Sequence, residues 1–138
     1  MNKTFLSAWA ITFLAWMFGS FVVHGVLLQA DYAQLPQLFR SEAESQQYFP
    51  LLLLAHVLMA GALVRIYAQG REAKPWFGQG LRFGVTVALL TAVPGYTIYY
   101  VVQPMPGLHT IKQIVFDGSL VVLLGVLVAF LHRQRGSA

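Results

Sequence analysis

The stretch IKQIVFDGSLVVLLGVLVAFL, from Ile111 to Leu131, decides the fold because it is a long apolar run that contains one acid, Asp117. About 20 mostly apolar residues are enough for an α-helix to cross the hydrocarbon core of a bilayer. A carboxylate placed there costs about 2.5–3.5 kcal/mol on insertion scales, so such acids usually face protein or water and have partners. We therefore expect the rest of the chain to supply Asp117 with polar neighbours.

The composition indicates a membrane protein. The chain has 138 residues, of which 57% are hydrophobic and only 10% are charged, and its mean hydropathy is +0.63. An ordinary soluble domain carries about 25% charged residues. We therefore expect residues 1–138 to form a single transmembrane domain with no soluble domain. The absence of cysteine excludes disulfides and thiolate metal sites.

Four apolar runs predict four membrane spans, at about residues 5–28, 48–67, 81–102 and 111–131. The first run is longer than the roughly 7–15 apolar residues of a signal peptide, so we interpret it as an uncleaved span. In the third run, Pro94 followed by Gly95 predicts a kink, because proline removes a backbone hydrogen bond. The predicted fold class is all-α, an integral membrane four-helix bundle.

The basic residues predict the orientation of the bundle. Only Arg40 and Lys112 fall on one side of the four spans. The basic residues on the other side are Lys3, Arg65, Arg71, Lys74, Arg82, Arg133 and Arg135. Under the positive-inside rule this asymmetry places both termini in the cytoplasm, in the inner (cytoplasmic) membrane of a bacterium. Because the basic residues form no stripe interleaved with aromatics, we expect no nucleic-acid partner.

Polar side chains lie at a similar depth in all four spans, toward the non-cytoplasmic side. They are His24, His56, Tyr96 and Asp117 in spans one to four. We expect Asp117 to bond to one of the two imidazoles or to a tyrosine hydroxyl, which gives a buried polar cluster. Such a cluster either binds or transfers a ligand, or only fixes which helix faces inward.

The other polar residues of the spans are assigned by position. His109 and His132 lie at the two membrane boundaries, where we expect both to be exposed. The first span has a row of residues that share one helix face at a spacing of four. This row is Thr12, Trp16, Ser20 and His24.

Small residues predict where the helices pack closely. Gly84, Ala88 and Gly95 form a stripe in the third span, and Gly125 and Ala129 form a small-xxx-small pair in the fourth. Small residues let helix backbones approach each other in lipid, where no hydrophobic drive pulls helices together.

No complete catalytic or metal motif is present. Ser20, His24 and Asp117 can be combined into a nucleophile set, but Ser20 lies deep in an apolar span without recognisable oxyanion donors. The chemical alternative is a haem or a metal held between His24 and His56, since four-helix bundles often host bis-histidine sites. We expect no cofactor and no enzymatic activity.

Three short motifs carry a family resemblance. The chain has HGVLLQADY at His24 to Tyr32, GLRFG at Gly80 to Gly84, and a QPMP motif at Gln103 to Pro106. With this order and an acid in the last span, it resembles a group of small bacterial four-span membrane proteins of unknown function. Members of that group often have an acid four positions before the histidine, where this chain has Ser20. The resemblance implies the topology and carries no chemistry across.

Two functions remain open. The first is a non-enzymatic accessory or assembly subunit of a membrane complex, with the lipid bilayer, other membrane subunits or a second copy as partners. The second is a membrane protein that binds haem, a metal or a small ligand through its cluster of His24, His56, Tyr96 and Asp117.

Overall fold

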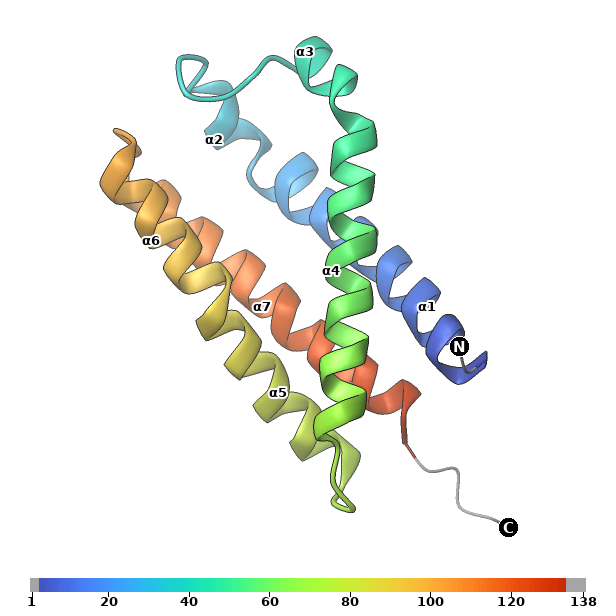
Figure 1. Cartoon of the computed structure of the whole chain (residues 1–138). Helices are drawn as coiled ribbons and strands as arrows, with labels where there is room; N and C mark the ends of the chain where they lie inside the picture. The colour runs from blue at the N-terminus through green and yellow to red at the C-terminus, as the bar shows by residue number, and fades with distance from the viewer. Residues whose placement is uncertain (1–2, 134–138) are drawn as a thin grey trace.

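The computed structural model describes residues 3–133, and this part of the chain is helical and contains no β-strand. Its helices are α1 (Lys3–Ser20), the π-helix η1 (Phe21–Leu27), α2 (Gln29–Ala33), α3 (Glu42–Gln47), α4 (Phe49–Gly70), α5 (Trp76–Leu90), α6 (Ala92–Val102) and α7 (Gly107–Leu131). The long helices run up and down in turn, so Lys3 and Arg133 lie at one end, the terminal end (Figure 1). The short helices lie at the opposite end, the α2/α3 end. Arg135 lies outside the described residues.

Four helical segments are long and apolar enough to cross a membrane. They are Lys3–Leu27, Phe49–Gly70, Trp76–Val102 and Gly107–Leu131. The last two begin before residues 81 and 111, where the apolar runs begin. Pro75 and Pro106 directly precede them, and proline is well suited to a helix start because its missing N–H has no intrahelical acceptor there. Hydropathy therefore finds the apolar runs but not the full length of these helices.

The third of these segments is interrupted at Thr91, between α5 and α6. The backbone angles of Thr91 are φ −117° and ψ −75°. Pro94 accounts for the break, since it offers no N–H to the carbonyl of Leu90 four residues earlier and its ring crowds that carbonyl. The helix resumes where the Gly95 N–H donates to the Thr91 carbonyl at 2.9 Å. The interruption lies where the Pro94–Gly95 pair predicts it.

Glycines bring α5 and α7 into backbone contact. A Cβ atom on Gly84 would lie 2.6 Å from the carbonyl oxygen of Val122, and one on Gly125 would lie 2.5 Å from the Cα of Gly84. A side chain larger than hydrogen does not fit at either position without moving a helix. This glycine contact fixes the distance between α5 and α7.

The other small residues that the sequence singles out are not all packed against a neighbouring helix. Ala88 and Ala129 are buried, and Ala129 faces Gly80, whose Cβ position is 2.7 Å from the Ala129 Cβ. Gly95 is not constrained in this way, because a Cβ there would meet no atom within 4 Å. It lies beyond the break, in α6, so the stripe of small residues in the sequence does not continue as one packing surface.

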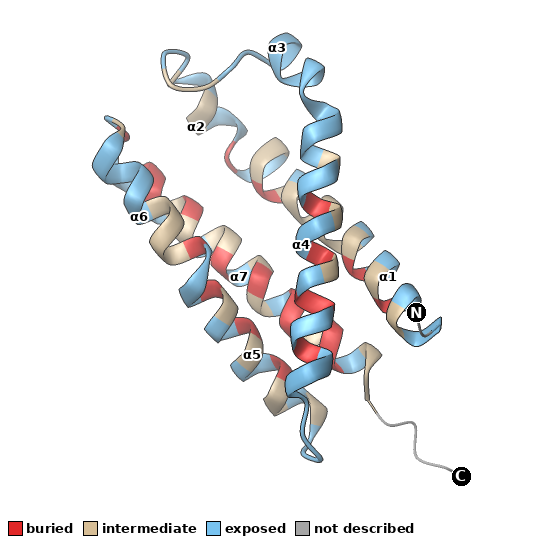
Figure 2. Cartoon of the chain, in the orientation of Figure 1, coloured by how far each residue is buried: buried red, intermediate tan, exposed pale blue. Residues whose placement is uncertain are grey.

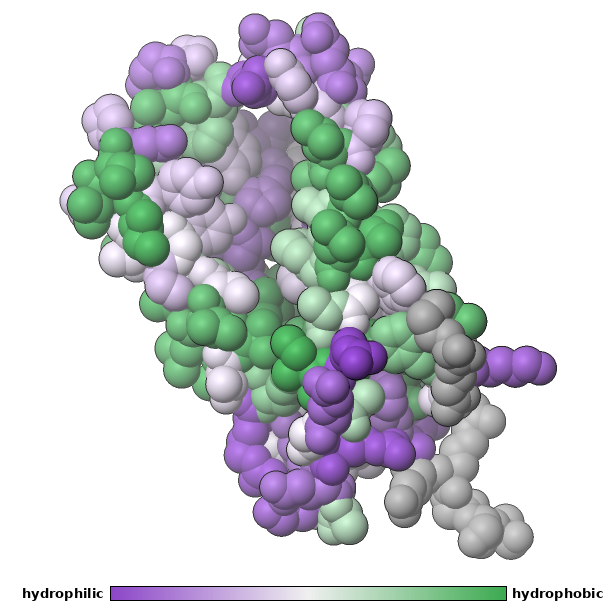
Figure 3. All heavy atoms as spheres, in the orientation of Figure 1, coloured by the Kyte–Doolittle hydropathy of each residue, from purple (hydrophilic) through white to green (hydrophobic). Residues whose placement is uncertain are grey.

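The apolar core lies toward the terminal end, where α1, α4 and α7 meet (Figure 2). Its buried residues are Ala8, Leu63, Val64, Tyr67, Leu124, Val128 and Ala129. At the α2/α3 end, by contrast, residues 49–55 of α4 include none that is buried, and α6 buries only Ala92. Between α4 and α6 the surface is hollowed and its floor is hydrophilic (Figure 3). The bundle is therefore tightly packed at one end and open at the other.

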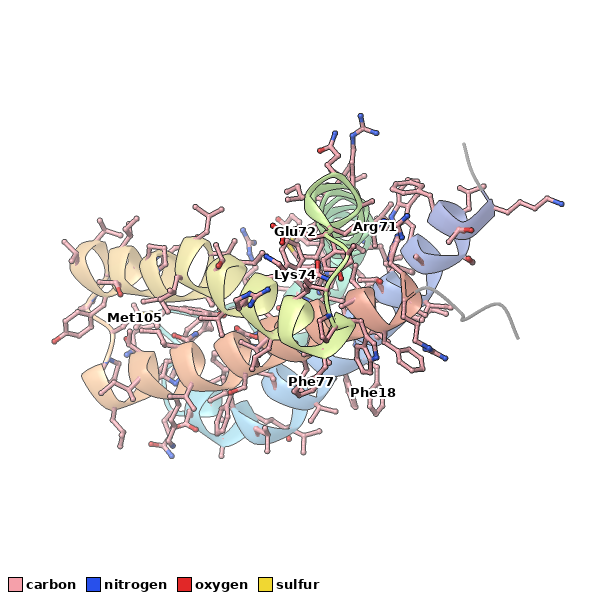
Figure 4. The ribbon with its side chains drawn as sticks, turned by 90° about the horizontal axis from the view of Figure 1, so that it is seen from below. Phe18, Arg71, Glu72, Lys74, Phe77 and Met105 are labelled. Carbon is pink, nitrogen blue, oxygen red and sulfur yellow. The ribbon has the colours of Figure 1, made fainter. Side chains whose placement is uncertain are left out.

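Charged side chains collect at the terminal end. Arg71, Glu72 and Lys74 lie in the turn between α4 and α5 (Figure 4). Glu72 pairs with Lys74, and the Arg71 guanidinium donates to the His132 carbonyl at 3.2 Å. The turn is thus tied to the end of α7.

Candidate polar site at the open end of the bundle

Asp117 of α7 is the centre of a polar site, since two side chains from other helices reach its carboxyl group. The Tyr96 hydroxyl, from α6, donates to Asp117 Oδ2. His24 Nε2, from η1, lies 3.1 Å from the same oxygen. The Asp117 side chain is 15% exposed and that of His24 is 35% exposed. The structure thus brings together three of the four residues that the sequence singles out.

The π-helix η1 directs His24 toward Asp117. The Leu28 N–H donates to the carbonyl of Val23 at 2.9 Å, five residues back, which is the π-helical spacing. The wider turn shifts the faces that successive residues occupy. Ser20 therefore faces α4, whereas His24, four residues later, faces α7. The single polar face that the sequence predicts from Thr12 to His24 is divided between two neighbouring helices.

Tyr32 of α2 extends the site toward the α2/α3 end. Its hydroxyl lies 2.6 Å from His24 Nδ1 and accepts a longer hydrogen bond of 3.4 Å from the Gln113 side-chain amide. Burial raises the pKa of Tyr32, and the nearby Asp117 and Asp31 carboxylates raise it further. The hydroxyl consequently keeps its proton and can donate it to His24 Nδ1.

An ion pair holds α2 over the site. Lys112 Nζ lies 2.7 Å from Asp31 Oδ1, and both side chains are partly exposed. Asp31 and Tyr32 are adjacent in sequence, so this pair and the Tyr32 hydrogen bonds fasten the same short helix to α7.

The contacts form one continuous chain of donors and acceptors. Gln113 donates to Tyr32, which donates to His24 Nδ1, and His24 Nε2–H donates to Asp117, which also accepts from Tyr96. With an ionised carboxylate and a neutral imidazole, every contact has one donor and one acceptor. Such a chain can hold a hydrogen-bonding ligand or pass a proton.

His56 lies outside this chain. Its Nδ1 is 2.8 Å from the Leu52 carbonyl, an acceptor, so Nδ1 carries the proton. Ser20 then donates to His56 Nε2 at 2.9 Å, and the Trp16 ring packs edge-on against the imidazole. The Ser20 hydroxyl, one turn before His24, is thus bonded to the buried His56 ring.

The ring nitrogens of both histidines are bonded to protein groups in this structure. Both ring nitrogens of His24 are used by Tyr32 and Asp117, and both of His56 by Ser20 and Leu52. Ligation would require breaking two of these bonds. Among residues 3–133, no group of three His, Cys, Asp or Glu side chains could hold a metal ion.

Sequence reasoning missed three members of the site. Tyr32 and Gln113 were not singled out, and His109 was expected to be exposed at the boundary. His109 is in fact buried, because the Tyr32 and Phe39 rings pack against it at centroid distances of 5.1 and 5.7 Å. One signal was available, since His109, Gln113 and Asp117 follow a spacing of four on α7.

No protein-family model, curated protein or solved structure matches the chain. The functional assignment therefore comes from the geometry of the site.

Proposed function

We propose that the protein is an integral protein of a bacterial inner membrane, with both termini in the cytoplasm. Its four long apolar helices support insertion. The orientation is supported by the basic residues of the described chain, which are concentrated at the terminal end. Those residues are Lys3, Arg65, Arg71, Lys74, Arg82 and Arg133.

We propose that its function is to bind a small, lipid-soluble molecule that carries carbonyl or hydroxyl groups. The observation that supports this is the hydrogen-bonded chain centred on Asp117, which joins η1, α2, α6 and α7, in a bundle whose surface is hollowed between α4 and α6 (Figure 3). A polar cluster that only fixes helix packing would be expected to be closed off from lipid and water, yet the His24 side chain is 35% exposed. A molecule dissolved in the bilayer could reach the exposed part of this side chain and exchange hydrogen bonds with the chain of donors and acceptors.

Tryptophan fluorescence can test ligand binding, because Trp16 packs against the His56 ring about two helical turns before His24. A short-chain benzoquinone probe is titrated into the protein in lipid nanodiscs. We expect saturable quenching, and an affinity lower by about tenfold or more in Asp117→Asn and His24→Phe, since a hydrogen bond to a charged group contributes about 1.5–3 kcal/mol. Ser7→Ala is the matched control, as the Ser7 hydroxyl bonds only to the Thr4 carbonyl near the terminal end.

The opposite result would be quenching that rises linearly with probe concentration and is identical in all four proteins. It would mean that the probe only partitions into lipid, and ligand binding of this class would be rejected.

The second candidate is an accessory or assembly subunit of a membrane complex. The observation that favours it is again the open end, because α6 and residues 49–55 of α4 bury almost nothing and a helix of another subunit could pack there. The test is affinity purification from native membranes in a mild detergent. A subunit would be recovered with a stoichiometric membrane partner, and repeated recovery of the protein alone would reject this function.

A further inference from the structure

Two buried polar side chains of the site, on the side toward the α2/α3 end, have atoms without partners. His109 and Gln113 lie one turn apart on α7, and each is only 3% exposed. Among the described residues, neither ring nitrogen of His109 has a hydrogen-bond partner, and the same holds for Gln113 Oε1. Buried polar groups are nearly always hydrogen-bonded to protein or to ordered water. Three buried polar atoms without hydrogen-bond partners, on adjacent turns of one helix face, therefore indicate a bound polar molecule.

The surroundings of these atoms suit a water molecule. A buried water typically makes two to four hydrogen bonds to protein groups that lack other partners. His109 provides a donor or an acceptor, and Gln113 Oε1 provides an acceptor. Tyr32 forms part of the same wall, since its ring packs edge-on against His109 and its hydroxyl accepts from the Gln113 amide.

We infer that a water molecule bonded to His109 and Gln113 completes a proton pathway from the aqueous phase at the α2/α3 end to Asp117. His109, Gln113 and Asp117 line one face of α7 at a spacing of four. Tyr32 and His24 supply the connecting hydrogen bonds along this face. The pathway begins near the helix start at Gly107 and ends at the carboxylate.

Proton transfer along this pathway is balanced. In this pathway the water also donates to the Tyr32 hydroxyl oxygen, so an excess proton on the water passes to that oxygen while the Tyr32 O–H proton moves to His24 Nδ1. His24 then releases the proton of Nε2 to Asp117 Oδ2. One proton is taken up from water, the Asp117 carboxylate becomes neutral, and His24 ends as the other neutral tautomer with its Nε2 accepting from the carboxyl group.

The groups around Asp117 are consistent with entry from this end. It faces an imidazole of η1 and a phenol of α6 directly, and the phenol of α2 through that imidazole. The only titratable side chain that α4 has at this level is His56, which is turned to Ser20. The one ion pair among the described residues near the entrance joins Asp31 to Lys112. The inference does not require a bound ligand, so it goes beyond the proposed function.

Infrared spectroscopy of the full-length protein in lipid films tests the pathway. The buffer is switched between acid and neutral pH, and protonation of Asp117 is followed through its carboxyl band, which is identified by its loss in Asp117→Asn. His109→Phe keeps the ring contacts with Tyr32 and Phe39 but removes both nitrogens. We expect the variant to protonate Asp117 at least about tenfold more slowly than the wild type, because it lacks one of the two side chains that hold the water.

Two further variants make the result specific. Gln113→Leu removes the other contact to the water and is expected to slow the response as well. His132→Phe removes a boundary histidine at the terminal end, which donates to the Val128 carbonyl, and is expected to respond like the wild type. Circular dichroism melts identify any variant that does not fold, and Gln113→Leu then serves in place of His109→Phe.

The inference is overturned if His109→Phe and Gln113→Leu respond as fast as the wild type, or if the Asp117 band does not change with pH in any protein. Failure of the benzoquinone titration leaves this measurement unaffected, because no ligand is added. The two proposals are therefore tested separately.

Discussion

Replacement of Gly84 by alanine is expected to separate α5 from α7. The new Cβ would lie 2.6 Å from the Val122 carbonyl oxygen and 2.7 Å from the Val122 Cα. Ordinary Cβ contacts begin near 3.4 Å, so the helices must move apart by about 0.8 Å, and overpacking of this kind costs about 1–3 kcal/mol. The higher helix propensity of alanine offsets about 0.8–1 kcal/mol of this cost. The net loss in the free energy of unfolding is then up to about 2 kcal/mol.

Gly118→Ala is the matched control for this substitution, since Gly118 is also a buried glycine, within α7, but its Cβ position has no atom within 4 Å. It gains the same propensity without a clash, so the two variants should differ by about 1–3 kcal/mol. The assay is unfolding by SDS in mixed micelles, followed by circular dichroism and by the fluorescence of Trp76, which packs on Phe130 of α7 at a centroid distance of 5.4 Å. Equal stability of Gly84→Ala and Gly118→Ala would refute the glycine contact.

Two smaller predictions concern other polar contacts. Ser20→Ala leaves the buried Nε2 of His56 without a donor and should lower the free energy of unfolding by about 1–3 kcal/mol. Ser7→Ala, at an exposed site, should change it little. Equal effects of the two substitutions in the same SDS assay would contradict the Ser20–His56 hydrogen bond. Hydrogen bonds from Ser41 lower the pKa of Glu44, so the capping box of α3 is intact above the ordinary glutamate pKa and is lost as the pH falls through the lowered value. The protection of the α3 amides against hydrogen exchange should therefore exceed that in Ser41→Ala at neutral pH. It should fall to the level of that variant at acid pH, since the box is absent from Ser41→Ala throughout.

The sequence predicts the elements that depend on one residue type. The apolar run around Asp117 forms a long helix, the break at Thr91 follows from Pro94, and Gly84 and Gly125 lie in a close helix contact. Each of these follows from a local rule: hydropathy and length, a missing N–H, or a missing Cβ. The sequence also predicts an imidazole or a tyrosine hydroxyl as the partner of Asp117, because the height of a residue along the bundle can be counted along its helix.

The remaining features depend on how the chain is placed in three dimensions. Nothing in the sequence marks η1 as a π-helix, yet it decides that His24 reaches α7 whereas Ser20 reaches α4. His109 is buried because the connection before α3 folds back and places Phe39 on it. A boundary position in the sequence does not reveal such a cover. The hydrogen-bonding state of His56 likewise depends on the helix that happens to lie opposite.

Stability measurements can separate a functional Asp117 site from one that only fixes packing. Asp117→Leu alone leaves the Tyr96 hydroxyl and the His24 imidazole without their acceptor, at a cost of about 1–3 kcal/mol for each. The quadruple variant Asp117→Leu, Tyr96→Phe, His24→Leu, Tyr32→Phe removes these three polar groups together with the Tyr32 hydroxyl, which would otherwise lose its acceptor on His24. Replacement of a whole buried polar set by apolar residues is often neutral or stabilising by about 1–4 kcal/mol.

We therefore expect the quadruple variant to be at least as stable as the wild type and more stable than Asp117→Leu in the SDS assay. In that case the bundle folds better without its polar site, and the site is retained because of what it binds or transfers. If the quadruple variant is instead less stable than the single variant, the hydrogen bonds of Tyr32, His24, Tyr96 and Asp117 hold α2, η1, α6 and α7 together. The cluster would then be explained by packing alone, and the argument for a ligand at the open end would lose its basis.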